Sequence, residues 1–476
     1  MSTSNTPAES AALVAEANEA VVIDNSNRST TPTSEAFTSF IMSNWADRED
    51  SLPPLREQAP FAARRRAELS RRYPGQRLVI RSGEMKQRSN DTFYEYRAHS
   101  AFSHLTGWAT DSEPGSVLVF EPTPTGHDVT LYFRERAGRD SDEFYANPEI
   151  GEFWIGPRPS LTQVSADLGL PTLALAEFAP TEADVTLADT QLLQDLSELR
   201  LVKDPYEIQQ MRDAVAATAR GFDDIVAQLP SITDHSRGER LVEGAFHNRA
   251  RLDGNAVGYE TIAASGSHAC ILHWTRNDGP VTPGDLILID AGVELDSLYT
   301  ADITRTLPIN GTFSPTQRQV YEAVREAADA ALAVVRPGIK FREIHATAMN
   351  VIARYTSEWG FLPVSLEDTL GSDVQYHRRY MVHGTSHHLG IDVHDCAQAR
   401  RDLYLEGTLE AGMVFTIEPG LYFQPDDLTV PAEFRGIGVR IEDDILVTET
   451  GAENLSAYIP RTADEVEAWI ARHNAS

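Results

Sequence analysis

The sequence predicts an α/β (α+β) protein of two domains, and three observations lead to this prediction. The chain has 476 residues, which is more than a single hydrophobic core normally serves. In its first part, short apolar runs typical of strands alternate with helical stretches, which favours a mixed α/β layer. In its second part, strand-like apolar runs carry acidic residues. We expect a tail at 1–35, a first domain at 36–198 and a second at 199–476.

Composition limits the setting and the partners of the chain. The tail is rich in Ser, Thr, Ala, Asn and Glu and lacks a signal-peptide pattern, so we expect it to be disordered. No run approaches the roughly 18 apolar residues of a membrane span. The formal charge of −30 argues against nucleic acid or an anionic membrane as partner. Only two cysteines occur, Cys270 and Cys396, which favours a soluble protein of the reducing cytoplasm.

The first domain shows one basic helix and three strands. Residues 62–72 contain five arginines and predict a helix with a solvated basic face. Strands are expected at 77–81, 116–120 and 129–133, with Pro- and Gly-rich segments between them.

The second domain begins with a clear helix signal. Asp204 offers a cap, Pro205 suits the first helical position, and Glu207 adds an acid to the first turn. Further helices are expected around 237–253, 315–335 and 340–359.

Four carboxylates belong to the strand-like runs of this domain. Asp290 ends the run Leu286-Ile-Leu-Ile, and Asp302 follows twelve residues later, which suits two antiparallel strands. The Ala-Gly after Asp290 permits close backbone approach. Glu418 ends the run 413–418, which Pro419-Gly420 should stop, and Glu442 is expected on a strand at 438–442. Buried carboxylates without partners are costly, so these acids imply a shared cation.

The number and kind of ligands indicate two divalent ions. Four carboxylates carry −4 and two such ions carry +4, and His387 adds one imidazole. An oxygen-rich set favours Mn²⁺, with Zn²⁺ and Co²⁺ as alternatives. Two metals can share and activate a water, so metal-assisted hydrolysis is expected.

Several neighbouring residues allow a different interpretation. His383 and His387 have the spacing of a zinc-protease helix, but Gly384 stands where that motif needs Glu. His388 should point away from His387, as a surface or packing residue, and His268 is ambiguous. Thr304 is either a plain strand residue or a hydrogen-bond partner of a ligand carboxylate.

A stretch of about 260 residues, from about Leu199 to Thr462, contains six motifs that resemble those of the pita-bread metallopeptidases, and among these the Xaa-Pro aminopeptidases (aminopeptidase P). The motifs are Ala269-Cys-Ile-Leu-His-Trp274, Leu288-Ile-Asp-Ala-Gly292, Ala301-Asp-Ile-Thr-Arg-Thr306, His383-Gly-Thr-Ser-His-His-Leu-Gly-Ile-Asp-Val-His-Asp395, Thr416-Ile-Glu-Pro-Gly-Leu-Tyr422 and Arg435-Gly-Ile-Gly-Val-Arg-Ile-Glu-Asp-Asp444.

The resemblance implies a fold and a set of site residues. The fold is an N-terminal α/β domain followed by a curved antiparallel sheet covered by helices. The implied metal ligands are Asp290, Asp302, His387, Glu418 and Glu442, with Asp302 and Glu442 bridging. The implied catalytic residues are Glu418, His273, His383 and His394, and those that bind substrate or brace the ligands are Val393, Tyr422 and Arg440. The resemblance also implies a homo-oligomer, a dimer or tetramer.

The implied reaction is hydrolysis of the bond between a free N-terminal residue and a following proline. Glu418 is expected to take the proton of the attacking water and pass it to the proline nitrogen, and His383 to donate to the oxyanion. The main alternative is a prolidase, for which Arg440 is the candidate that captures the dipeptide carboxylate. A peptide-binding module without activity is disfavoured because all five ligands are present, and a methionine aminopeptidase is disfavoured by the long N-terminal domain.

Overall fold

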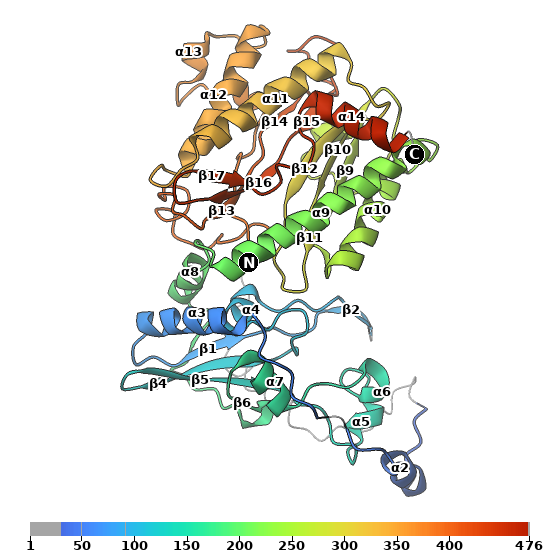
Figure 1. Ribbon diagram of the computed structural model, residues 1–476, viewed down its shortest axis with the longest axis vertical. Coiled ribbons are helices and arrows are strands. Elements are labelled where there is room, and N and C mark those ends of the chain that lie inside the picture. Colours follow the sequence, from blue (N-terminus) through green and yellow to red (C-terminus); the bar gives the residue numbers. More distant parts are fainter. Residues whose placement is uncertain (1–29, 49, 91, 475–476) are drawn as a thin grey trace. The chain divides into compact units, whose positions relative to one another are not determined.

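The computed structural model describes residues 30–48, 50–90 and 92–474. The chain forms two compact units, of which the first ends at Asp189 and the second begins at Thr190 (Figure 1). The tail expected at 1–35 lies outside the described residues except for its last six, and helix α2 (Glu35–Met42) begins at its end. Among the described helices, none combines the length and the apolar character needed to cross a bilayer.

A five-stranded mixed sheet forms the first unit, in the order β6-β5-β4-β1-β7. β1, β4 and β5 pair antiparallel, and β6 and β7 add parallel edges. The three predicted strands are confirmed. The bounds are β1 Leu78–Arg81, β2 Gln87–Ser89, β3 Thr92–Phe93, β4 Val117–Thr123, β5 Gly126–Phe133, β6 Thr172–Ala174, β7 Val185–Thr186, α3 Ala59–Arg72, α4 Ser100–Thr106, α5 Glu143–Ala146, α6 Glu152–Ile155 and α7 Leu161–Leu168.

The predicted basic helix exists as α3, but its expected solvated face is wrong for two arginines. Arg65 and Arg66 are buried and donate to the carbonyls of His104 (2.9 Å) and Leu105 (2.7 Å) near the C-terminal end of α4. Carbonyls at a helix C-terminus lack partners within the helix and favour cations. These two side chains therefore join α3 to α4.

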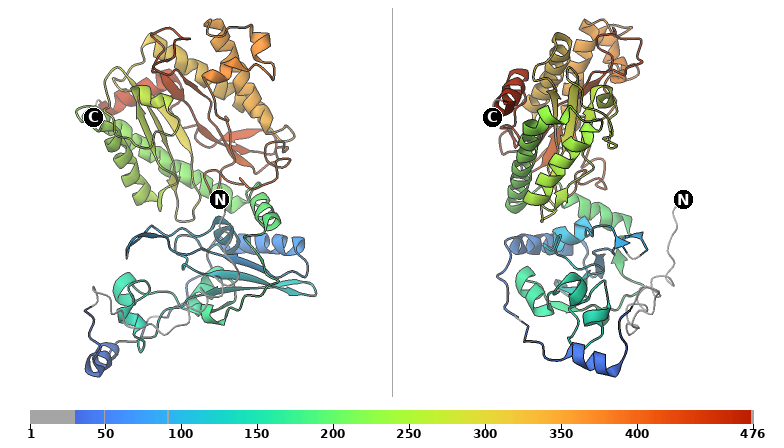
Figure 2. Two further views of the ribbon diagram at one scale, coloured as in Figure 1. Left: turned by 180° about the vertical axis from the view of Figure 1, so that it is seen from behind. Right: turned by 90° about the vertical axis from the view of Figure 1, so that its right-hand side faces the viewer.

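Long helices and small sheets make up the second unit (Figures 1 and 2). Most of their apolar side chains belong to one hydrophobic core. The predicted cap is confirmed: the Asp204 carboxylate accepts from the Glu207 amide, and the Glu207 side chain accepts from the Asp204 amide. The helices are α8 Thr190–Glu198, α9 Pro205–Ile232, α10 Gly238–Asp253, α11 Pro315–Val334, α12 Arg342–Glu358, α13 Leu366–Thr369 and α14 Ala463–Asn474.

The expected curved sheet is present as small antiparallel sheets, ordered β12-β10-β9, β11-β8, β13-β16-β17 and β14-β15. Single bridges, Thr304 to Glu442 and His388 to Phe415, join residues of neighbouring sheets and loops. The bounds are β8 Ala256–Val257, β9 Ile262–Ser265, β10 Leu286–Ala291, β11 Val293–Glu294, β12 Ile303–Pro308, β13 Val414–Ile417, β14 Gly420–Tyr422, β15 Gly438–Arg440, β16 Asp443–Val447 and β17 Ala452–Asn454.

Strand pairing brings the first two acids together as predicted. β10 and β12 are antiparallel with Asp290 opposite Thr304, and Asp302 directly precedes β12. A Cβ on Gly292 would lie 1.6 Å from the Ala301 carbonyl oxygen, so only glycine permits this approach.

Two strand ends differ from expectation. β13 stops before Glu418 as Pro419-Gly420 predicted, but β14 starts at once at Gly420. Glu442 does not end a strand, because β15 stops at Arg440 and the Glu442 amide instead donates to the Thr304 carbonyl at 3.1 Å. The bridge to the neighbouring sheet replaces the pairing that would continue β15.

Candidate active site

A cavity of about 600 Å³ in the second unit collects the predicted ligands. All five line it, together with His273, His383, His394, Val393 and Arg440. The remaining lining residues are Tyr259, Glu260, Ile262, Leu272, Thr275, Gly384 and Ser386.

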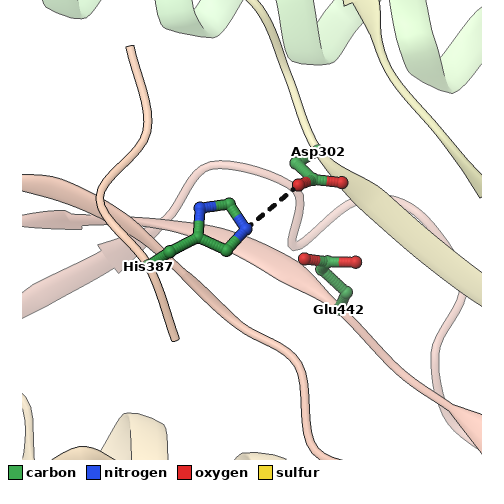
Figure 3. A group of neighbouring side chains, drawn as sticks. All are labelled: Asp302, His387 and Glu442. Carbon is green, nitrogen blue, oxygen red and sulfur yellow. Dashed lines mark ion pairs between the residues drawn. The ribbon is translucent and has the colours of Figure 1, made fainter. Parts of the chain in front are cut away.

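Three of the predicted ligands converge on one point. One ligand atom each of Asp302, His387 and Glu442 lies within 4.8 Å of the others, and Figure 3 shows the three side chains pointing toward one another from different segments. His387 Nε2 lies 3.2 Å from an Asp302 oxygen and 3.7 Å from a Glu418 oxygen. Asp290 is linked to this group through Tyr259, whose hydroxyl reaches both Asp290 (2.6 Å) and Asp302.

The electrostatics of this cluster fit bound cations. Burial raises the pKa of Glu442 well above its usual range, and the nearby Asp302 and Glu418 raise it further. Burial also raises the pKa of Glu418, to about 7, although His387 and Arg440 oppose the shift. Burial alone would lower the pKa of His387, but Asp302 and Glu418 raise it to about 9. The chain's own cations therefore leave excess negative charge here, and the oxygen-rich donors suit divalent ions.

Arg440 and Thr304 hold the carboxylates of Asp290 and Glu442 in place. Arg440 donates to Asp290, to the Tyr422 hydroxyl (3.2 Å) and to the Thr304 hydroxyl (3.1 Å). Thr304 in turn donates to Glu442 at 2.6 Å, so the hydrogen-bonding interpretation of Thr304 is the one that applies. Arg440 is 4% exposed and its guanidinium is committed to these three partners.

The three predicted histidines differ in how far they are free to act. His383 Nδ1 donates to the Gly384 carbonyl (2.6 Å), and its Nε2 lies 2.8 Å from the Tyr422 hydroxyl. Burial and Arg440 lower the pKa of His383 to about 3, so the ring is neutral and Nε2 accepts from Tyr422. Both nitrogens are thus engaged, which does not fit the expected role as oxyanion donor.

His273 and His394 are exposed in the cavity. Their ring nitrogens make no hydrogen bond to any residue that the structure describes. The rings of His394 and His387 meet edge to face at 4.5 Å, and burial, with His387 adding, lowers the pKa of His394. A neutral imidazole keeps one N–H available for a substrate oxygen.

Of the other residues considered in the sequence, some line the cavity and others pack behind or away from it. Val393 lines the cavity, whereas Tyr422 is buried behind it and contacts His383 and Arg440. His388 is a packing residue, stacked on Phe341 at 4.6 Å. His268 contacts Glu239 at 2.7 Å and stacks on a neighbouring tryptophan.

Sequence reasoning missed three residues near the site. The Tyr259 hydroxyl contacts both Asp290 and Asp302, and Asp444 accepts from the Asp302 amide at 3.2 Å. Glu239, from α10, accepts from the amides of Ser265 and Gly279, from His268 and from Trp274, and so holds the segment that carries His273. Asp444 follows Glu442 closely enough to have been noticed, but Tyr259 and Glu239 carry no local signal.

Comparison with known families gives two matches. Residues 209–449 match the model of metallopeptidase family M24, and residues 62–184 match the aminopeptidase P N-terminal domain.

Similar proteins cover almost the whole chain. Xaa-Pro aminopeptidase 2 of Streptomyces coelicolor is 52% identical over 466 residues, which is 93% of this chain and 97% of that protein. Xaa-Pro aminopeptidase of Escherichia coli is 34% identical over 448 residues, covering 86% of this chain and 97% of that protein.

Solved structures agree with these relatives. A variant of E. coli aminopeptidase P in complex with substrate superposes with a TM-score of 0.75 at 31% identity, covering 89% of this chain and all of that one. A zinc-substituted form of the E. coli enzyme in complex with product gives 0.74 at 32% identity, covering 88% of this chain and 99% of that one.

Proposed function

The chain belongs to metallopeptidase family M24 and has the activity of an Xaa-Pro aminopeptidase, and from this premise we propose how its residues perform the reaction. The observation that carries the proposal is the convergence of Asp302, His387 and Glu442 within one cavity that also contains Asp290 and Glu418. These five side chains are the residues that would hold the metal.

We propose two divalent ions, with Mn²⁺ first and Zn²⁺ or Co²⁺ as alternatives. The excess of buried carboxylate over cationic side chains supports bound cations, and the predominance of oxygen donors supports the choice of ion. When bound, such ions supply an activated water and polarise the carbonyl of the first residue.

The protein groups then position the substrate and move its protons. Glu418 is the proposed base, because its oxygens lie 3.6 Å from His383 and 3.7 Å from His387 and face the cavity. It takes the water proton and delivers it to the proline nitrogen, which as a tertiary amide nitrogen carries no hydrogen before cleavage. We now assign the oxyanion hydrogen bond to His394 instead of His383, with His273 as the second candidate. Val393 lines the space for the proline ring.

The geometry also separates aminopeptidase from prolidase. A prolidase needs a cation for the carboxylate of its dipeptide substrate. Of the described residues that line the cavity, Arg440 is the single arginine or lysine, and its guanidinium is already committed to Asp290, Tyr422 and Thr304. This agrees with the close relatives, which are Xaa-Pro aminopeptidases.

Hydrolysis of Arg-Pro-Pro and of the dipeptide Ala-Pro, by metal-stripped protein titrated with Mn²⁺, Zn²⁺ or Co²⁺, tests the proposal. We expect metal-dependent release of arginine, abolished in Glu418→Gln and unchanged in Glu449→Gln, an exposed acid outside the cavity. Cleavage of the dipeptide alone would indicate a prolidase, and absence of turnover with every ion would contradict the enzymatic assignment.

We also propose a homo-oligomer, a dimer or tetramer, located in the cytoplasm. Three consecutive large apolar side chains on α6 support assembly: Phe153, Trp154 and Ile155 are 55%, 57% and 54% exposed. Both cysteines are free and buried, which suits a reducing compartment. Domain boundaries at 36–198 and 199–476 remain our proposal.

A further inference from the structure

Glu260 is the one acid lining the cavity that the proposed mechanism does not use. It is exposed, lies in a loop directly after Tyr259, and lines the same cavity as the five proposed ligands. Its carboxylate makes no hydrogen bond or ion pair with any residue of the described chain. Every other acid that lines the cavity contacts a neighbouring histidine, arginine, tyrosine or threonine.

The lining residues between Tyr259 and Thr275, here called the wall, combine apolar, polar and anionic side chains. Val393 is assigned to the proline ring of the substrate. The other lining side chains that can contact the N-terminal residue of the substrate come mainly from 259–275. Ile262 and Leu272 are apolar, Thr275 is polar and exposed, and Glu260 is anionic. Apolar side chains and a lone carboxylate that line one cavity match a substrate side chain with a long methylene stem and a cationic end.

The position of Glu260 relative to the reacting centre fits this role. Tyr259 contacts Asp290 and Asp302 through its hydroxyl. Glu260, the next residue in the chain, therefore lies near the proposed metal ligands without being one of them. The carbonyl carbon that is attacked belongs to the first residue, whose side chain therefore begins close to this wall.

We propose that Glu260 is a specificity-determining residue that selects peptides with lysine or arginine before the proline, by pairing with the side-chain cation. This inference rests on the proposed function, since it concerns the substrate of the same site. The pair is partly open to solvent, so its effect is modest, about two- to fivefold in kcat/KM, and it weakens as salt is raised.

The test compares substrates that differ in charge but hardly in shape. The kcat/KM of Arg-Pro-Pro is divided by that of citrulline-Pro-Pro, in which a neutral ureido group replaces the guanidinium, for the metal-loaded wild type, Glu260→Gln and the surface control Glu449→Gln. We expect a ratio of about two to five in the wild type and in the control, and a ratio near one in Glu260→Gln. Glu260→Lys should bring the ratio below one.

Each other outcome has a distinct meaning. A wild-type ratio near one, or a ratio that Glu260→Gln leaves unchanged, overturns the inference. An equal loss on both peptides also overturns it, because Glu260 would then act on the shared α-ammonium group or on the loop. Failure of the wild type to cleave either peptide with any ion would instead contradict the proposed function.

Discussion

Removal of the Tyr259 hydroxyl should weaken metal binding without unfolding the protein. This hydroxyl lies 2.6 Å from Asp290 and also contacts Asp302, so in Tyr259→Phe two proposed ligands lose the group that fixes their separation. A hydrogen bond to a charged group contributes about 1.5–3 kcal/mol, which corresponds to roughly 10- to 150-fold in a dissociation constant. Loss of a hydrogen-bond partner of a metal ligand typically lowers metal affinity 10- to 100-fold, which agrees with this range.

Calorimetric titration of metal-stripped protein with Mn²⁺ measures this effect and the number of ions at once. Tyr458→Phe serves as the control, because Tyr458 is 61% exposed and lies outside the cavity. We expect two ions per chain and an affinity loss of about 10- to 100-fold in Tyr259→Phe. A change below about threefold, equal to that of the control, would refute the argument that this hydroxyl organises the ligands.

Three further predictions follow from the described contacts. Arg440→Lys keeps the charge but cannot serve Asp290, Tyr422 and Thr304 together, so kcat/KM should fall by about 100-fold; equal kinetics would contradict the bracing role. In metal-free protein the raised pKa values of Glu418 (about 7) and His387 (about 9) contribute stability that is present below their unfolded values and lost as pH rises through the folded ones. The buried neutral His383 has the opposite effect on stability, so the contribution of Glu418 is isolated by comparing the urea unfolding of wild type and Glu418→Gln. Between pH 5 and 9 the wild type should lose on the order of 2–3 kcal/mol more than the variant, less so with Mn²⁺, and an equal pH dependence of the two proteins would contradict the assignment. Replacing Phe153 and Trp154 by Ser should reduce the mass measured by light scattering, whereas Leu428→Ser, at an exposed site in the other unit, should not; an unchanged mass excludes α6 from the interface.

Local sequence signals predicted the helices and strands, and the motifs predicted five side chains that line one cavity. The cap at Asp204, the long helices and the pairing of the segments around Asp290 and Asp302 all follow from spacing and residue type. The Ala-Gly after Asp290 correctly indicated close backbone approach.

The remainder depends on contacts between distant segments. Tyr259 meets its partners 31 and 43 residues away, and nothing in its surroundings marks it as different from an ordinary loop tyrosine. The Nε2 atom of His383 finds its partner in the Tyr422 hydroxyl, which lies 39 residues further on. The sequence predicts that Arg65 and Arg66 are solvated, because the carbonyl groups that accept their hydrogen bonds belong to another helix. Such pairings require three-dimensional information.

The bridge between Thr304 and Glu442 has a consequence for the order of folding. It joins two sheets whose bridged residues lie 138 positions apart, and closing so long a loop carries a large entropic cost that only a nearly complete fold can offset. The proposed metal ligands come from both sheets, so ions held by them would bind tightly only after this closure. Bound metal should therefore slow unfolding while leaving the refolding rate almost unchanged. The metal centre would then stabilise the folded unit without taking part in the folding nucleus.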